Sequence, residues 1–170
     1  MTTYGTTMTE AALSPKPLRE DMMTALYTRA RFKKLADVPT PEYKTEGAAG
    51  FDLAASEDTM IAPREHKLVP TGIALACPGG HYLALSPRSS LFKNFGLIMV
   101  NSPGIVDADY CGDEDELLLS LLNLSDTLAE IRKGDRLAKG VFQRYTRVRF
   151  EEVEDMMAVS RGGYGSTGLR

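Results

Sequence analysis

Short runs of β-forming residues, separated every ten residues or so by Gly, Pro, Asp or Asn, extend from Arg31 to about residue 150. The predicted strands are 30–35, 51–54, 60–61, 67–69, 72–77, 82–86, 97–100, 104–106, 117–123 and 136–150. No predicted strand is followed by a long amphipathic helix, which disfavours a parallel α/β sheet. The pattern therefore predicts an all-β fold of the sandwich, jelly-roll or barrel kind.

The two ends of the chain differ from this central part. Residues 1–17 are rich in Thr, Ser and Ala and predict a mobile tail, whereas the apolar spacing over 18–28 predicts a short helix. No linker or internal repeat divides the centre. We therefore expect an N-terminal extension of residues 1–30, one β domain of residues 31–152, and a C-terminal arm of residues 153–170 with a glycine-rich motif.

Composition narrows the class of protein. A chain of 170 residues, 43% of them hydrophobic, can bury one substantial core, and its net charge of -3 argues against nonspecific nucleic-acid binding. No apolar run approaches the roughly eighteen residues of a membrane span, and the start does not resemble a signal peptide. Two cysteines and two histidines provide neither a disulfide framework nor a histidine metal site. We expect a cytoplasmic protein that binds neither membrane nor nucleic acid.

Residues 104–112 combine two carboxylates with an aromatic ring between flanking glycines, and predict a hairpin. In an extended chain Asp107 and Asp109 point to one face and Tyr110 to the other. If a bulge or turn interrupts that alternation, a carboxylate and the ring turn toward a common pocket. A carboxylate so placed can orient a water and take its proton. The alternative is that these are ordinary turn and core residues.

Three further segments have the chemistry of an anion site. Residues 87–91 place a guanidinium beside two hydroxyls, and residues 134–139 add two cations. Residues 160–168 combine free backbone amides, two hydroxyls, a cation and one aromatic ring, which suits wrapping a phosphate while the ring stacks on a base. The alternatives are solvated surface turns for the first two and a disordered terminus for the third.

Taken in order, five segments resemble the motifs of the trimeric dUTPase family. They are AGFDLAA at 49–55, PRSSL at 87–91, GIVDADY at 104–110, GDRLA at 134–138 and GYGSTG at 163–168. The resemblance implies a jelly-roll-like subunit in a homotrimer, with active sites shared between chains and closed by a flexible C-terminal arm. It implies Mg²⁺-assisted hydrolysis of dUTP to dUMP and pyrophosphate, which keeps uracil out of DNA and supplies dUMP for dTMP synthesis.

The resemblance also implies roles for individual residues. Asp107 is the base that deprotonates the attacking water, and Tyr110 lies against the deoxyribose, where it crowds out a 2′-hydroxyl. Backbone groups around Gly104 read the uracil edge. The metal is held mainly by the triphosphate, with Asp52 near its bound waters rather than as a direct ligand. The other implied substrate-binding residues are Arg88, Ser89, Ser90, Lys139, Arg161, Tyr164, Gly165, Ser166 and Thr167.

Some positions depart from the family pattern. Lys139 stands where Gln is usual, and Arg161 is closer than usual to the paired glycines. The acidic run 113–116 adds about three residues, either as a solvated loop or as extra carboxylates near the metal. Two other functions stay open: a dCTP deaminase, which shares the fold, and a nucleotide-sensing protein that acts by binding a partner.

Overall fold

The structure is a computed structural model that describes residues 28–160 and 162. The predicted N-terminal helix, and Arg161, Tyr164, Gly165, Ser166 and Thr167 of the arm, lie outside the described residues. Within them, ten strands and one short helix form, and the all-β prediction is confirmed. No helix in this part of the chain is long and apolar enough to cross a membrane.

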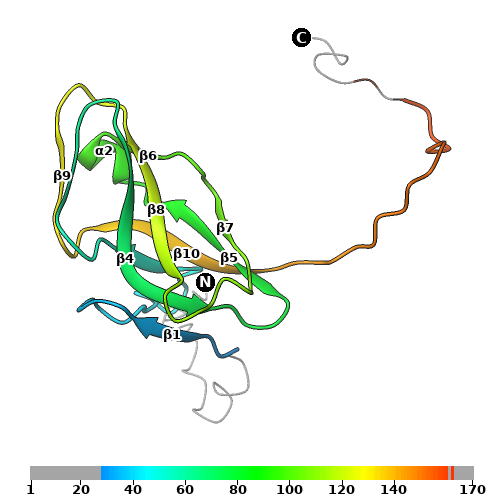
Figure 1. Ribbon diagram of the computed structural model, residues 1–170, viewed down its shortest axis with the longest axis horizontal. Coiled ribbons are helices and arrows are strands. Elements are labelled where there is room, and N and C mark those ends of the chain that lie inside the picture. The colour runs from blue at the N-terminus through cyan, green and yellow to red at the C-terminus, as the bar shows by residue number, and fades with distance from the viewer. Residues whose placement is uncertain (1–27, 161, 163–170) are drawn as a thin grey trace, which may run out of the picture.

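The elements follow one another along the chain, and the long segment 35–50 connects β1 to β2 (Figure 1). They are β1 Arg31–Lys34, β2 Phe51–Ala54, β3 Thr59–Ile61, β4 His66–Ala76, β5 His81–Pro87, α2 Leu91–Phe95, β6 Leu97–Met99, β7 Gly104–Val106, β8 Glu116–Asn123, β9 Ala129–Ile131 and β10 Arg136–Arg144.

Two four-stranded antiparallel sheets share one hydrophobic core. Their strand orders are β1-β4-β8-β6 and β2-β10-β5-β7, and β3 and β9 form a separate pair. Strand β8 shows the alternation that drives this packing, because Leu117, Leu119 and Leu121 are buried while Leu118 between them is exposed. These leucines meet core residues of the other sheet, such as Leu83 of β5. Burial of one face of each sheet fixes the register of both.

The structure differs from the predicted strands in three places. Two predicted strands, at 67–69 and 72–77, form the single strand β4, whose register against β8 shifts between Pro70 and Ala74. Strand β9 and helix α2 were not predicted, because three and five residues are too short for a clear periodicity. The last strand ends at Arg144 rather than at residue 150, since Arg144 pairs with His81, the first residue of β5.

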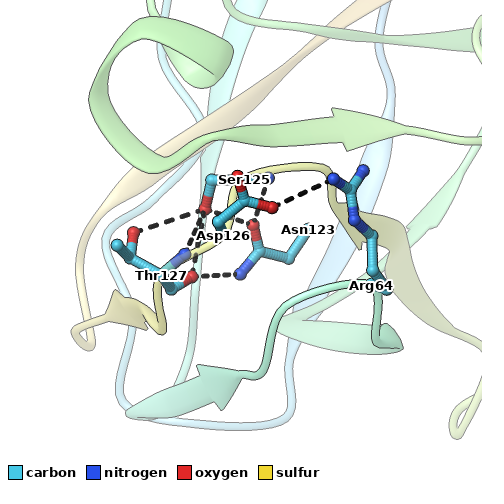
Figure 2. Close-up of polar contacts among 5 residues, drawn as sticks. All are labelled: Arg64, Asn123, Ser125, Asp126 and Thr127. Atoms are coloured by element: carbon cyan, nitrogen blue, oxygen red, sulfur yellow. Dashed lines mark hydrogen bonds and ion pairs between the residues drawn. The ribbon is translucent and has the colours of Figure 1, made fainter.

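A closed polar cluster lies where β8 ends (Figure 2). The Asn123 side chain is completely buried, and its Nδ2 donates to the carbonyls of Ile61 at 2.9 Å and Thr127 at 2.8 Å. Its Oδ1 accepts from the amide of Ser125 at 2.9 Å and from the Ser125 hydroxyl at 2.7 Å. Every donor and acceptor of the carboxamide is therefore used, and the amide joins β3, β8 and the turn before β9.

Candidate active site

The segment after β6 crosses from one sheet to the other. Strand β6 pairs with β8, whereas β7 pairs with β5 in the second sheet. The predicted hairpin over residues 104–112 is therefore wrong, since the strands on either side of Asp107 belong to different sheets. After β7 the chain makes a tight turn, in which the Tyr110 amide donates to the Asp107 carbonyl at 3.2 Å.

This turn interrupts the strand alternation in the way that a shared pocket requires. Asp107 and Tyr110 both line a cavity of about 260 Å³, which the last residues of β7 and the first residues of β8 enclose. The Asp107 carboxylate is exposed, and the Tyr110 side chain is half-exposed at 42%. The Tyr110 hydroxyl donates to the Glu116 carbonyl at 3.0 Å. A carboxylate and an aromatic ring thus face one small, open pocket.

Asn101 lines the same pocket, and the sequence-based reasoning missed it. The available signal was an amide residue directly before the Ser-Pro-Gly turn that leads into β7. Gly104 is buried, and a methyl group on its Cα would lie 3.4 Å from Nδ2 of the Asn101 side chain, from the Leu85 Cβ and from the Met99 Cε. A larger side chain at 104 would fill this end of the pocket, so glycine keeps the amide accessible.

A second group of charged residues gathers where β2, β5 and β10 meet. The Asp52 side chain, only 10% exposed, has Oδ1 3.4 Å from Arg88 Nε and Oδ2 2.9 Å from Arg136 Nη1. The Arg88 guanidinium also donates to the Arg136 carbonyl at 3.2 Å. Arg136 was not among the predicted site residues, because only strand pairing brings it opposite β2. One carboxylate therefore holds two guanidiniums side by side.

The other predicted anion-binding residues lie around this charged group. Lys139 is half-buried and pairs in register with Asp52 on one side and Ser86 on the other. Because directly opposed residues share a face of the sheet, Lys139 lies on the Asp52 face. Ser90 precedes helix α2, and its side chain makes no capping bond to that helix. The structure thus brings three of the predicted motifs together, those of Asp52, Arg88 and Lys139.

The two groups border different cavities of this chain. Asp52 and Arg136 line a cavity of about 110 Å³, whereas Asp107 and Tyr110 line the pocket beside β7. The carboxylate and ring are therefore near the start of β8, and the guanidiniums are near the start of β10.

Three acidic side chains of the run 113–116 make ion pairs or hydrogen bonds within the chain. Asp113 pairs with Lys33 of β1 at 3.2 Å, Asp115 Oδ2 accepts the Gly112 amide at 2.6 Å, and Glu116 Oε1 accepts the Gly72 amide at 2.5 Å. In the described part of the chain, no group of three or more His, Cys, Asp or Glu side chains is arranged to hold a metal ion. The prediction that these acids support a metal stays a prediction.

Cys77 lies near the turn at residues 107–110, and its thiol stays protonated at neutral pH. Burial raises the pKa of the Cys77 thiol, and the charges of Cys111 and Asp107 raise it further, against a smaller lowering by the Leu83 amide. A thiol with a raised pKa is a poor nucleophile.

Comparisons with known proteins agree on one family. The dUTPase family model matches residues 36–168. The deoxyuridine 5'-triphosphate nucleotidohydrolase of Thermobifida fusca is 44% identical over 135 residues, covering 78% of this chain and 74% of the relative. The enzyme of the same name from Helicobacter pylori is 44% identical over 131 residues, covering 76% of this chain and 88% of the relative.

Solved structures agree with this match. The dUTPase of Streptococcus mutans superposes with a TM-score of 0.65 at 31% identity, covering 70% of this chain and 98% of that one. A dUTPase of Staphylococcus bacteriophage 80alpha, solved with dUPNHPP, superposes with a TM-score of 0.74 at 23% identity, covering 84% of this chain and 100% of that one. The second likeness shows a shared fold.

Proposed function

We propose that Asp107 is the catalytic base of this chain, which belongs to the dUTPase family. The chain is a dUTP diphosphatase, an enzyme that hydrolyses dUTP to dUMP and pyrophosphate. The observation that carries this proposal is the turn at residues 107–110, which directs a carboxylate and an aromatic ring into one pocket. Removal of dUTP keeps uracil out of DNA and supplies dUMP.

The pocket beside β7 suits a deoxyuridine. The Asn101 carboxamide offers one donor and one acceptor together, which complements the neighbouring N–H and C=O groups of a uracil edge. Backbone groups around Gly104 provide further contacts to that edge. The Tyr110 ring covers the sugar, where it leaves no space for a 2′-hydroxyl. Base and sugar selection thus come from different residues that line one small cavity.

Asp107 supplies the proton-transfer step. Its exposed carboxylate accepts the proton of a water that attacks the α-phosphorus, as pyrophosphate leaves. Because one turn holds the backbones of Asp107 and Tyr110 together, the base lies close to the residue that contacts the sugar. Positioning of this kind acts on the transition state.

The charged group around Asp52 suits the triphosphate. Arg88 and Arg136 present two guanidiniums, Lys139 adds an ammonium on the same side, and Ser89 and Ser90 offer hydroxyls. Asp52 is already paired with two arginines, so a Mg²⁺ bound here would be held mainly by phosphate oxygens and water, and Asp52 would act on it through that water. The metal would neutralise charge on the phosphate oxygens.

We propose that the active enzyme is a homotrimer whose sites combine both groups from different subunits. The chain leaves the body after β10 as an extended segment (Figure 1), in which Val148 is 64% and Phe150 is 96% exposed. The body carries an apolar cavity of about 730 Å³ lined by Phe32 and Tyr43, among others. Seating the segment on a neighbouring body would cover both apolar surfaces.

In such a trimer the C-terminal arm closes over the nucleotide of another subunit. Tyr164 would stack on the base, while Arg161, Gly165, Ser166 and Thr167 bind the phosphates. Closure excludes bulk water during the reaction. We expect the trimer to work in the cytoplasm, where nucleotides are made.

Product analysis tests the reaction. Purified protein with Mg²⁺ is given dUTP, dCTP, dTTP and UTP separately, while pyrophosphate and ammonia are followed together. We expect pyrophosphate from dUTP and far less from the other three. Ammonia from dCTP would identify a deaminase instead. Binding of dUTP with no product from any nucleotide would favour the nucleotide-sensing alternative.

Sedimentation equilibrium tests the assembly. We expect a mass three times that of the 18.6 kDa chain. Phe150→Ser should weaken the trimer, whereas Met157→Ser, a change at an exposed apolar residue farther along the chain, is the matched control. A monomer that hydrolyses dUTP at full rate would contradict shared sites.

A further inference from the structure

Two consecutive residues of β4 donate hydrogen bonds to the start of β8. The β4–β8 register shifts between Pro70 and Ala74, and this irregular stretch turns two polar groups toward β8. The buried Thr71 hydroxyl donates to the Leu117 carbonyl at 2.7 Å. The Gly72 amide donates to Glu116 Oε1 at 2.5 Å. Strand β8 therefore begins at a fixed point.

The donor to the Glu116 carboxylate is itself held in place. Gly72 has a φ of +68°, and a Cβ there would lie 3.0 Å from side-chain atoms of Ala36 and Val38 and 3.1 Å from Ser56. Glycine is needed both for this backbone angle and for the close packing. An amide so confined gives the carboxylate a set direction, and a charged acceptor makes the bond strong.

Glu116 also contacts the ring that faces the sugar. Its carbonyl accepts the Tyr110 hydroxyl at 3.0 Å, while its carboxylate accepts the Gly72 amide. The Tyr110 side chain is 42% exposed, so core packing alone does not hold the ring. Glu116, Tyr110 and Asp107 all line the pocket of about 260 Å³. The orientation of the ring thus depends on where the Glu116 backbone stands.

We propose that Glu116 is a positioning residue that sets the preference for 2′-deoxyribose. Its carboxylate, bound to Gly72, fixes the carbonyl that holds the Tyr110 hydroxyl, and the ring so held closes the space where a 2′-hydroxyl would lie. The inference rests on the proposed function, because it assumes that Tyr110 lies against the sugar. Glu116 itself does not touch the reacting atoms.

Four single variants test the inference. Glu116→Ala removes the bond to Gly72, and Glu116→Gln keeps an acceptor at the same place. Tyr110→Phe removes the hydroxyl and keeps the ring. Glu114→Ala is the matched control, since it removes an exposed carboxylate two positions away in the same loop. For each variant, kcat/KM is measured with dUTP and with UTP, together with the melting temperature.

We expect Glu116→Ala to lower the dUTP-to-UTP ratio of kcat/KM about tenfold, the scale of one lost orienting hydrogen bond. Glu116→Gln should restore most of the ratio, Tyr110→Phe should lower it, and Glu114→Ala should leave it unchanged. The double variant Glu116→Ala with Tyr110→Phe should lose no more than the larger single loss, because both changes break one connection.

A purely structural role for Glu116 predicts a different result. Glu116→Ala would then lower the melting temperature and both kcat/KM values equally, leaving the ratio unchanged, and the inference would be wrong. Affinities for dUMP and UMP, measured by calorimetry, give the same ratio without turnover. A wild-type protein that binds dUMP but hydrolyses nothing would contradict the proposed function, while the dUMP-to-UMP ratio would still decide the role of Glu116.

Discussion

The two ends of strand β8 hold polar side chains in opposite ways. At the far end, the Asn123 carboxamide is fully buried and all its hydrogen-bonding groups are used within the chain (Figure 2). At the near end, Glu116 and Tyr110 border an open pocket in which Asp107 is exposed. The same strand thus carries a closed polar cluster and an open one.

This difference teaches how the fold separates stability from chemistry. A buried polar group with every bond satisfied fixes one geometry and offers nothing to a ligand. A pocket group with unused bonding capacity can bind substrate, but it contributes less to folding. Changes at the open end should therefore alter catalysis with little effect on stability, and changes at the closed end should do the reverse.

The largest expected effect is at the open end. Asp107→Asn should lower kcat by between about 100-fold and 10,000-fold, the usual contribution of a general base, while the melting temperature stays near wild type. Single-turnover kinetics and calorimetry with a non-hydrolysable dUTP analogue measure the rate and the affinity separately. Asp109→Asn, the same change two positions on, is the control. Turnover that survives Asp107→Asn would refute the assignment of the base.

The next effect is at the closed end. Asn123→Ala should lower the free energy of unfolding by about 3 kcal/mol, because it removes the hydrogen bonds from the side chain to the buried carbonyl of Ile61 and from the amide of Ser125 to the side chain. Urea unfolding at one protein concentration measures the loss. The folded fraction should keep its kcat. A variant with normal stability and reduced kcat would reverse the contrast between the two ends.

Thr71→Val tests the hydrogen bonding between β4 and the start of β8 without changing a residue that lines the pocket beside β7. The change removes one buried hydrogen bond, from the Thr71 hydroxyl to the Leu117 carbonyl, and should cost about 1 kcal/mol of stability. Because the Gly72 bond to Glu116 remains, the dUTP-to-UTP ratio should not change. A falling ratio would mean that both bonds, and not the Glu116 carboxylate alone, set the Tyr110 ring.

The smallest effect is on the surface of the closed end. Asp126 pairs with Arg64 at 3.0 Å, with 91% and 65% of the two side chains exposed. Asp126→Asn should change the free energy of unfolding by about 0.5 kcal/mol or less, and less still at high salt. Denaturant curves at two salt concentrations measure it. A loss comparable with that of Asn123→Ala would mean that the exposed pair, rather than the buried amide, holds this turn.

The sequence predicted the fold class, the family and part of the site of this protein. Short runs of β-forming residues between Gly, Pro, Asp and Asn predicted an all-β fold, and the ten strands confirm it. The order of the five motifs predicted the dUTPase family, and the family match over residues 36–168 confirms it. The residues themselves suggested that a turn could bring one carboxylate and the ring to a shared pocket, and the family resemblance singled out Asp107 and Tyr110, which both line one pocket.

Pairing between distant strands decided the rest. The sequence did not indicate that β7 pairs with β5 while β8 pairs with β4, so a hairpin was predicted where the chain changes sheets. Arg136 and Glu116 have ordinary local sequences, and they join the two groups through contacts with Asp52 and Gly72, which lie far away along the chain. The chemistry of a side chain follows from its residue type and can be predicted from the sequence. The residues that it contacts, and therefore its orientation, are determined by tertiary packing.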